Sequence, residues 1–198
     1  MSPQSFIATN IVFDLAKYIH EYSKLVLADF FDIVNYCIFS LEKDDISKFN
    51  TVIKTIFNAI SELKINQKER AMIMLNSFFT QVQKLSLIKI FTFYDYNVYL
   101  PLLFEIFKEA KCYDNESLMV NAIHIMLLFL KNHRSFCMAF LESDMLKSII
   151  KYLSIVFKFS NDKHIQHNRD GTIIIKNEHA CLELLELINY IASGCQCI

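Results

Sequence analysis

The segment from Leu118 to Leu130 constrains the fold of this 198-residue chain more than any other feature. Every position in it is apolar except Asn121 and His124. A helix that is apolar on all sides has to be covered on all sides by other parts of the protein. A simple four-helix bundle leaves each helix half exposed, whereas a stack of helical hairpins encloses its inner layer between neighbouring repeats. The segment therefore predicts an inner helix of a stacked helical protein.

Helical periodicity continues along almost the whole chain. Apolar residues at helical spacing predict a series of helices between residues 11 and 159, joined by short links, and a last helix at 178–192. The chain has two glycines, where average usage would supply about 14. Because tight β-turns rely on glycine, this composition argues against a β-rich fold. We expect one all-α domain over 1–198, a right-handed stack of about nine to ten antiparallel helices.

Three interruptions are expected in this helical pattern. Asp95 to Tyr99 reads as a break, after which Pro101 fits the first turn of the next helix. The segment 160–177 is polar and is expected to be a loop. Gly194 suits the stop of the last helix, so residues 193–198 are expected to be a frayed C-terminus.

The stretch 115–153 resembles an armadillo-type repeat. Asn121-Ala122-Ile123 lies in the apolar helix, a break follows at 132–136, and Met145 to Ile150 opens the next helix. This order of small, turn and apolar residues is common in armadillo and HEAT repeats of about 40 residues. The resemblance implies a helical-repeat scaffold, in which asparagines on the innermost helices clamp the backbone of an extended peptide. Carried over to this chain, that role falls to Asn76, Asn121 and Asn189.

A second, fainter likeness is to the FPL domain, the armadillo-like N-terminal domain of endosome and autophagy scaffolds. It rests on Phe93-Tyr94, on the apolar run 102–107 and on Glu116-Ser117-Leu118-Met119-Val120. The match has departures, because Leu118 is inserted and the basic residues expected after the valine are replaced by Asn121 and His124.

The expected partner-binding residues are polar or aromatic side chains at helix surfaces and breaks. Aromatic side chains dominate binding hot spots, and five of them crowd the segment 91–99. The alternative is that the aromatics fold onto the core and that the asparagines bond between helices. The set is Asn76, Asn121, His124, Asn189, Tyr94, Tyr96 and Tyr99.

Charge and motifs exclude several kinds of chemistry. Lys and Arg number 20 against 21 Asp and Glu, a net charge of −1, so no basic surface for nucleic acid is expected. Glycine-rich phosphate loops are absent, and no cofactor is expected.

The histidines and cysteines do not form a recognisable metal or catalytic motif. The spacing of zinc ligands is missing in the pairs His164/His167, His179/Cys181 and Cys195/Cys197. Cys137 follows His133 by four residues but sits among apolar residues, so it reads as a core thiol.

The sequence predicts no integral membrane segment, since its longest stretch without acidic or basic residues spans 117–130, short of the 18 or more that a membrane helix needs. No secretory signal is recognised, so the six cysteines are expected to be reduced and the location cytoplasmic. Cys195-Gln196-Cys197-Ile198 formally fits a prenylation motif, although Gln196 stands where an aliphatic residue is usual.

The expected function is a non-enzymatic scaffold or adaptor that holds a protein partner on a helical groove. Three alternatives stay open at this point. The first is a compact helical-bundle regulator like the apoptosis regulators, although their Asn-Trp-Gly-Arg element is missing and the chain has no tryptophan. The others are a lipid-anchored membrane-trafficking factor and a helical enzyme with an unrecognised site. The partner's identity and the oligomeric state are left open.

Overall fold

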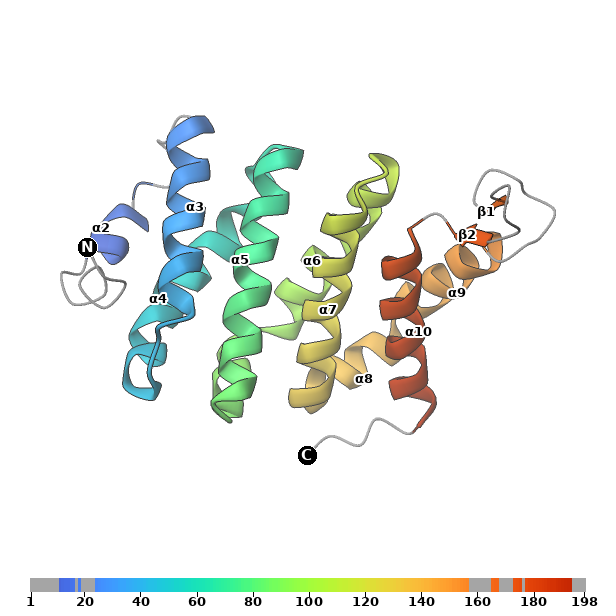
Figure 1. Ribbon diagram of the computed structural model, residues 1–198. Helices are drawn as coiled ribbons and strands as arrows, with labels where there is room; N and C mark the ends of the chain where they lie inside the picture. The colour runs from blue at the N-terminus through green and yellow to red at the C-terminus, as the bar shows by residue number, and fades with distance from the viewer. Residues whose placement is uncertain are drawn as a thin grey trace. The chain divides into compact units, whose positions relative to one another are not determined.

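The computed structural model describes residues 11–16, 18, 24–156, 165–167, 173–175 and 177–193. The described chain is built almost entirely from helices, which confirms the all-α class (Figure 1). It divides into two compact units, Met1–Asp95 and Tyr96–Ile198. The expectation of one domain over 1–198 stays a prediction.

Unit 1 places two helices side by side in one layer, with a third helix packed behind them (Figure 1). The pair is α3 and α5, and the helix behind is α4, which also contacts α2. The elements of unit 1 are α2 (Ile11–Ala16), α3 (Lys24–Ile38), α4 (Lys43–Ala59), the 3-10 helix η2 (Ile60–Glu62), α5 (Ile65–Lys84) and the 3-10 helix η3 (Ile88–Phe93).

Helices α3 and α5 run parallel. Arg70 forms an ion pair with Asp32 at 2.8 Å, and Gln81 Nε2 donates to the carbonyl oxygen of Leu41 at 3.4 Å. Residue numbers on both sides rise together along the contact, as they do only between parallel neighbours. The antiparallel connection is supplied by α4, which lies between the two in sequence.

The core of unit 1 is aromatic. Phe79 lies at its centre, with ring centroids 6.2 Å from Phe57, 5.6 Å from Phe91 and 5.1 Å from Tyr94. The Tyr94 hydroxyl donates a buried hydrogen bond of 2.6 Å to Oδ1 of Asn50. Each polar atom thereby satisfies the other inside an otherwise apolar core.

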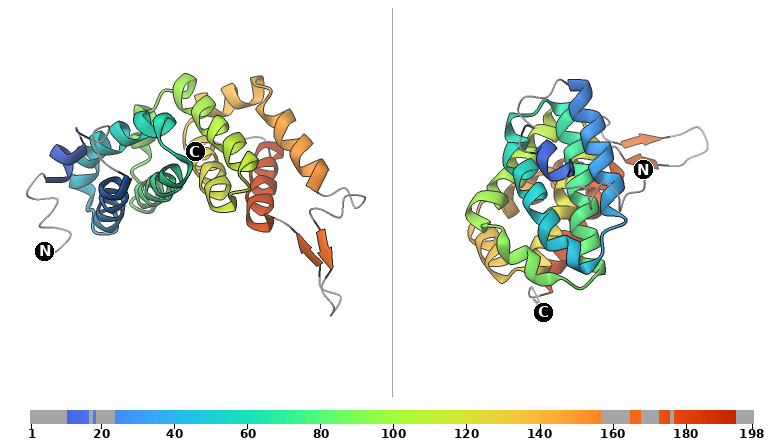
Figure 2. Two further views of the ribbon diagram at one scale, coloured as in Figure 1. Left: turned by 90° about the horizontal axis from the view of Figure 1, so that it is seen from above. Right: turned by 90° about the vertical axis from the view of Figure 1, so that its left-hand side faces the viewer.

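Unit 2 is also built in two layers. Helices α7 and α10 lie side by side in one layer, and α6, α8 and α9 form the other (Figures 1 and 2). The elements of unit 2 are α6 (Tyr96–Cys112), α7 (Glu116–Asn132), α8 (Arg134–Glu142), α9 (Met145–Val156), strands β1 (Ile165–His167) and β2 (Ile173–Ile175), and α10 (Glu178–Ala192).

The apolar helix is enclosed, as the sequence predicts. In α7 ten residues are buried, and they face α6, α8 and α10. Asn115 caps its N-terminus, where Asn115 Oδ1 accepts a 2.9 Å hydrogen bond from the Leu118 N–H. The buried residues are Leu118, Met119, Ala122, Ile123, Ile125, Met126, Leu127, Leu128, Phe129 and Leu130.

Two helices end in the same way without glycine. After α5, Ser86 has φ 58°, and the Leu87 N–H donates to the carbonyl oxygen of Val82 at 3.0 Å. After α6, Asp114 has φ 55°, and the Asn115 N–H donates to the carbonyl oxygen of Ala110 at 2.9 Å. This Schellman pattern usually takes glycine at the left-handed residue, so a glycine-poor chain uses serine and aspartate there instead.

Two expectations need correction. The expected break is shorter than predicted: it covers Tyr94 and Asp95, helix α6 already begins at Tyr96, and Pro101 lies inside the helix. Pro101 is exposed, and so is Asn97, whose carbonyl oxygen would accept from an N–H at position 101 in a regular helix. The expected loop contains the antiparallel pair β1–β2, with Ile165 opposite Ile175, because β-branched residues favour strands. Positions 194–198 and the rest of 160–176 lie outside the described residues.

Candidate functional site

One line of residues along helix α7 is accessible to solvent. Ser117 is exposed, and Asn121, His124 and Lys131 are partly exposed. These residues recur at spacings of three, four and seven, which places them on one face of the helix. A helix that is buried elsewhere therefore presents a hydroxyl, an amide, an imidazole and an ammonium group to the outside.

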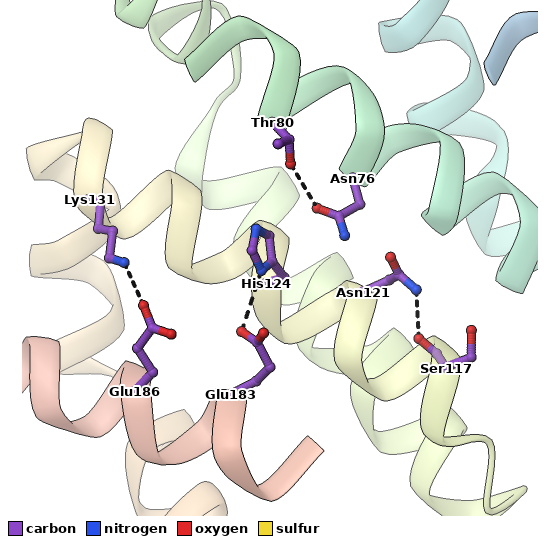
Figure 3. Close-up of polar contacts among 8 residues, drawn as sticks. All are labelled: Asn76, Thr80, Ser117, Asn121, His124, Lys131, Glu183 and Glu186. Carbon is purple, nitrogen blue, oxygen red and sulfur yellow. Dashed lines mark hydrogen bonds and ion pairs between the residues drawn. The ribbon is translucent and has the colours of Figure 1, made fainter. Parts of the chain in front are cut away.

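Helix α10 lies beside this line and supplies acidic groups to it (Figure 3). His124 Nδ1 is 3.4 Å from Glu183 Oε2, and Lys131 Nζ donates to Glu186 Oε1 at 2.8 Å. The Lys131 ammonium also lies 6.0 Å from the centroid of the Tyr190 ring. Residue numbers rise together along the two helices, so α7 and α10 run parallel, as α3 and α5 do in unit 1.

The N-terminus of α10 is held by the turn between α6 and α7 and by the first residue of α7. Glu116 Oε1 accepts a 2.9 Å hydrogen bond from the His179 N–H, which places a carboxylate at the positive end of the helix. Asn177 Nδ2 donates to Asp114 Oδ1 at 3.2 Å. These two contacts fix the position of α10 along α7, and the polar groups of the two helices are therefore aligned.

Helix α10 carries an apolar row next to its acidic one. Leu182 and Leu185 are 56% and 44% exposed, and Asn189 is also exposed. Spacings of three and four put all three on the solvent side of the helix. We use the name α7–α10 surface for the polar and apolar rows together: Asn121, His124, Lys131, Leu182, Glu183, Leu185, Glu186 and Asn189.

Three of the expected partner-binding residues lie on this surface. Asn121 Nδ2 donates to the Ser117 carbonyl oxygen at 2.8 Å, a bond within its own helix and not one between helices. His124 faces Glu183, and Asn189 is exposed. Asn76 belongs to unit 1, on α5, where its Oδ1 accepts from Thr80 Oγ1 at 3.4 Å (Figure 3).

The expected tyrosines do not form a surface group. Tyr94 is 1% exposed and packs in the aromatic core of unit 1, so its expected role as a partner contact is wrong. Tyr99 is buried as well. Tyr96 is partly exposed, and its ring lies edge-on to Phe136 with centroids 6.3 Å apart. Three of the five aromatic residues in 91–99, Phe91, Tyr94 and Tyr99, are buried, which agrees with the alternative that they fold onto the core.

The buried thiols among the described residues offer little nucleophilic chemistry. Burial raises the pKa of Cys181 to about 11, with Glu116 and Glu178 adding to the shift, and burial also raises the pKa of Cys37. A thiol with a raised pKa stays protonated near neutral pH and reacts slowly. Cys137 is buried, and burial lowers the pKa of His133, whose ring packs edge-on to Phe136.

No group of three or more metal-ligating side chains converges within the described part of the chain. His164, Cys195 and Cys197, which the sequence analysis weighed as zinc ligands or lipid attachment sites, lie outside the described residues.

Sequence reasoning did not single out Leu182 and Leu185. The signal was present, because α10 already buries Cys181, Leu184 and Leu187 on its inner face. A helix that packs against the protein on one face does not need two further leucines on its exposed face. Apolar residues outside the buried face of a helix indicate a second contact surface.

Among the residues that the structure describes, no helix is both long enough and apolar enough to cross a membrane. Comparison with protein-family models, with curated proteins and with solved structures finds no match to this chain.

Proposed function

We propose that this protein is a non-enzymatic, armadillo-like helical-repeat adaptor that binds a protein partner on the α7–α10 surface. The observation that carries the proposal is the pair of exposed leucines, Leu182 and Leu185, beside a row of aligned polar groups. Apolar anchors within a polar rim are the usual anatomy of a protein-binding surface.

The polar row suits reversible binding. Asn121, His124 and Lys131 are partly exposed, and the ion pair of Lys131 with Glu186 is open enough for water or a ligand to replace it. Exchanging such contacts for contacts with a bound peptide costs little, because exposed ion pairs contribute about 1 kcal/mol or less. The amide of Asn121 can turn from its own helix to the backbone of a peptide, which is the role that the armadillo resemblance implies.

The layered arrangement within each unit supports the repeat interpretation. In unit 1 the parallel pair is α3 and α5, and in unit 2 it is α7 and α10. Parallel neighbours within a layer, connected through helices of the other layer, are what repeated helical hairpins produce. Such a layer presents side chains from successive repeats on one face, where an extended partner can contact them.

The test is affinity capture with the full chain, followed by reconstitution with the purified partner. We expect Leu182→Asp to lower the partner's affinity at least tenfold, because an exposed anchor is replaced by a charge. The matched control is Ile150→Asp on α9, whose side chain is 50% exposed in the other layer of unit 2. The control carries the same added charge and should keep the affinity of the unmodified chain.

Asn121→Ala separates binding from folding. Alanine is the better helix former, so the melting temperature should stay unchanged or rise slightly, while the partner's affinity falls. Capture that is equally strong with Leu182→Asp and Ile150→Asp would reject the α7–α10 surface. A large loss of melting temperature for Asn121→Ala would assign that residue to the core.

A further inference from the structure

Helix α8 carries its charges at the wrong ends. Arg134 is its first residue and Glu142 its last. The N-terminus of a helix is partially positive and the C-terminus partially negative, so each side chain sits beside a partial charge of its own sign. Neither side chain has a hydrogen-bond or ion-pair partner among the described residues. This arrangement destabilises helix α8 in the unbound protein. A bound molecule that neutralises both charges would remove the unfavourable interactions.

Both charges line the same open pocket. The pocket has a volume of about 360 Å³ and belongs entirely to unit 2. Its α8 residues recur at helical spacing on one face, and Met138 between the two charges is 49% exposed. The lining residues are Tyr96, Arg134, Ser135, Met138, Ala139 and Glu142.

Tyr96 forms one side of the pocket, and packing holds its side chain in place. Its ring lies edge-on to the buried Phe136, at a centroid distance of 6.3 Å. The pocket therefore combines a cation at one end, an anion at the other, and a methionine side chain between them. A simple anion would be attracted by Arg134 but repelled by Glu142. A simple cation would be attracted by Glu142 but repelled by Arg134.

We propose that this α8 pocket binds a short extended segment of a partner protein, with an acidic and a basic residue flanking an apolar one. Glu142 lies eight positions after Arg134, which corresponds to a rise of about 12 Å along the helix. An extended chain covers about 3.3 Å per residue, so the two charges of the ligand are three or four positions apart. The acidic residue pairs with Arg134, the basic residue pairs with Glu142, and the apolar side chain contacts Met138. This second site is independent of the α7–α10 surface.

The test uses the full chain and three blocked peptides that differ only in charge. The first contains Asp-Ala-Leu-Ala-Lys, and the others carry lysine at both charged positions or aspartate at both. Binding is followed by amide chemical shifts in a titration. We expect saturable binding of the first peptide, at least about fivefold tighter than either like-charged peptide, because a single reversed charge turns an attraction into a repulsion.

Charge reversal should move this preference in a defined way. Arg134→Glu should make the dilysine peptide the tightest ligand, and Glu142→Arg should do the same for the diaspartate peptide. Lys151→Glu on α9 changes the net charge as Arg134→Glu does and is exposed outside the pocket, so it should keep the original preference.

Stability gives the second readout. Arg134→Glu places a negative charge at the N-terminus of α8, and Glu142→Arg places a positive charge at its C-terminus. Each new charge interacts favourably with the helix dipole, so the melting temperature should stay the same or rise by about 1–3 °C. The proposal is overturned if no peptide binds saturably, if the preference does not follow the reversals, or if either reversal lowers the melting temperature by more than about 5 °C, which would make the charge structural.

Discussion

The two units differ in one of their polar contacts, although an exposed ion pair joins parallel helices in both. In unit 1, the Tyr94 hydroxyl and the Asn50 amide are buried together inside an aromatic core, 2.6 Å apart. In unit 2, the polar groups lie along the outside of the apolar helix α7, where Lys131 and Glu186 join it to α10. A polar contact therefore lies inside the core in one unit, and an ion pair lies at the surface in the other.

This difference indicates which unit is suited to binding. A buried acceptor that loses its donor costs about 1–3 kcal/mol, so the polar pair of unit 1 cannot be exchanged for contacts with a ligand. Partly exposed pairs are worth about 1 kcal/mol or less, and water replaces them readily. A surface that forms and releases contacts has to be built from the second kind. Both units have such a pair, and the proposed site lies in unit 2 because the exposed Leu182 and Leu185 lie beside the pair there.

The largest effect should come from the aromatic core of unit 1. Phe79 is fully buried among Phe57, Phe78, Phe91 and Tyr94, so Phe79→Ala leaves a cavity and should destabilise the protein by about 3–5 kcal/mol. Denaturant unfolding measures the loss.

Hydrogen exchange then tests whether the two units are separate. The rings around Phe79 all belong to unit 1, so Phe79→Ala should speed exchange in α4 and α5 more than in α7. The matched control is Phe93→Ala, at a ring that is 54% exposed, which should cost less than about 1 kcal/mol. Equal acceleration in both units would show that they unfold as one.

A smaller effect should come from removing one oxygen atom. Tyr94→Phe leaves Asn50 Oδ1 buried without its donor and should cost about 1–3 kcal/mol. Tyr190→Phe removes the hydroxyl that donates to the Leu130 carbonyl oxygen at 3.3 Å, but Tyr190 is only partly buried. Water can replace that bond, so the second variant should lose less than about 1 kcal/mol. Similar losses measured by calorimetry would contradict the contrast between the units.

The sequence predicts the helical part of the fold well because burial on all sides has a direct signature in the residues. The segment 118–130 has no polar face to expose, and its enclosure in α7 follows from that alone. The start of α6 was harder to place, since Pro101 suggests a first turn but tolerates a position deeper in an exposed helix. The short β1–β2 pair was missed because its isoleucines lie within a polar segment.

The candidate site was predicted only in part. Asn121 and His124 stand out because they interrupt an apolar run, and both reach the surface. Tyr94 was misplaced because aromatic density marks a core as readily as a hot spot. The charges of α8 carry no signal in sequence, since the conflict between Arg134 and the helix end exists only once the limits of the helix are known.

The smallest effect should come from the ion pairs that join parallel helices. A double-mutant cycle on Lys131→Met and Glu186→Gln should give a coupling of about 0.2–1 kcal/mol. The same cycle on Arg70→Met and Asp32→Asn in unit 1 should give a weaker coupling, because both of its side chains are more exposed than their counterparts in unit 2. High salt should reduce the coupling in unit 1 more strongly, since exposed charges are screened best. A larger coupling for Arg70–Asp32 would show that exposure does not set the strength of these contacts, and the argument for a readily exchanged surface in unit 2 would then lose its basis.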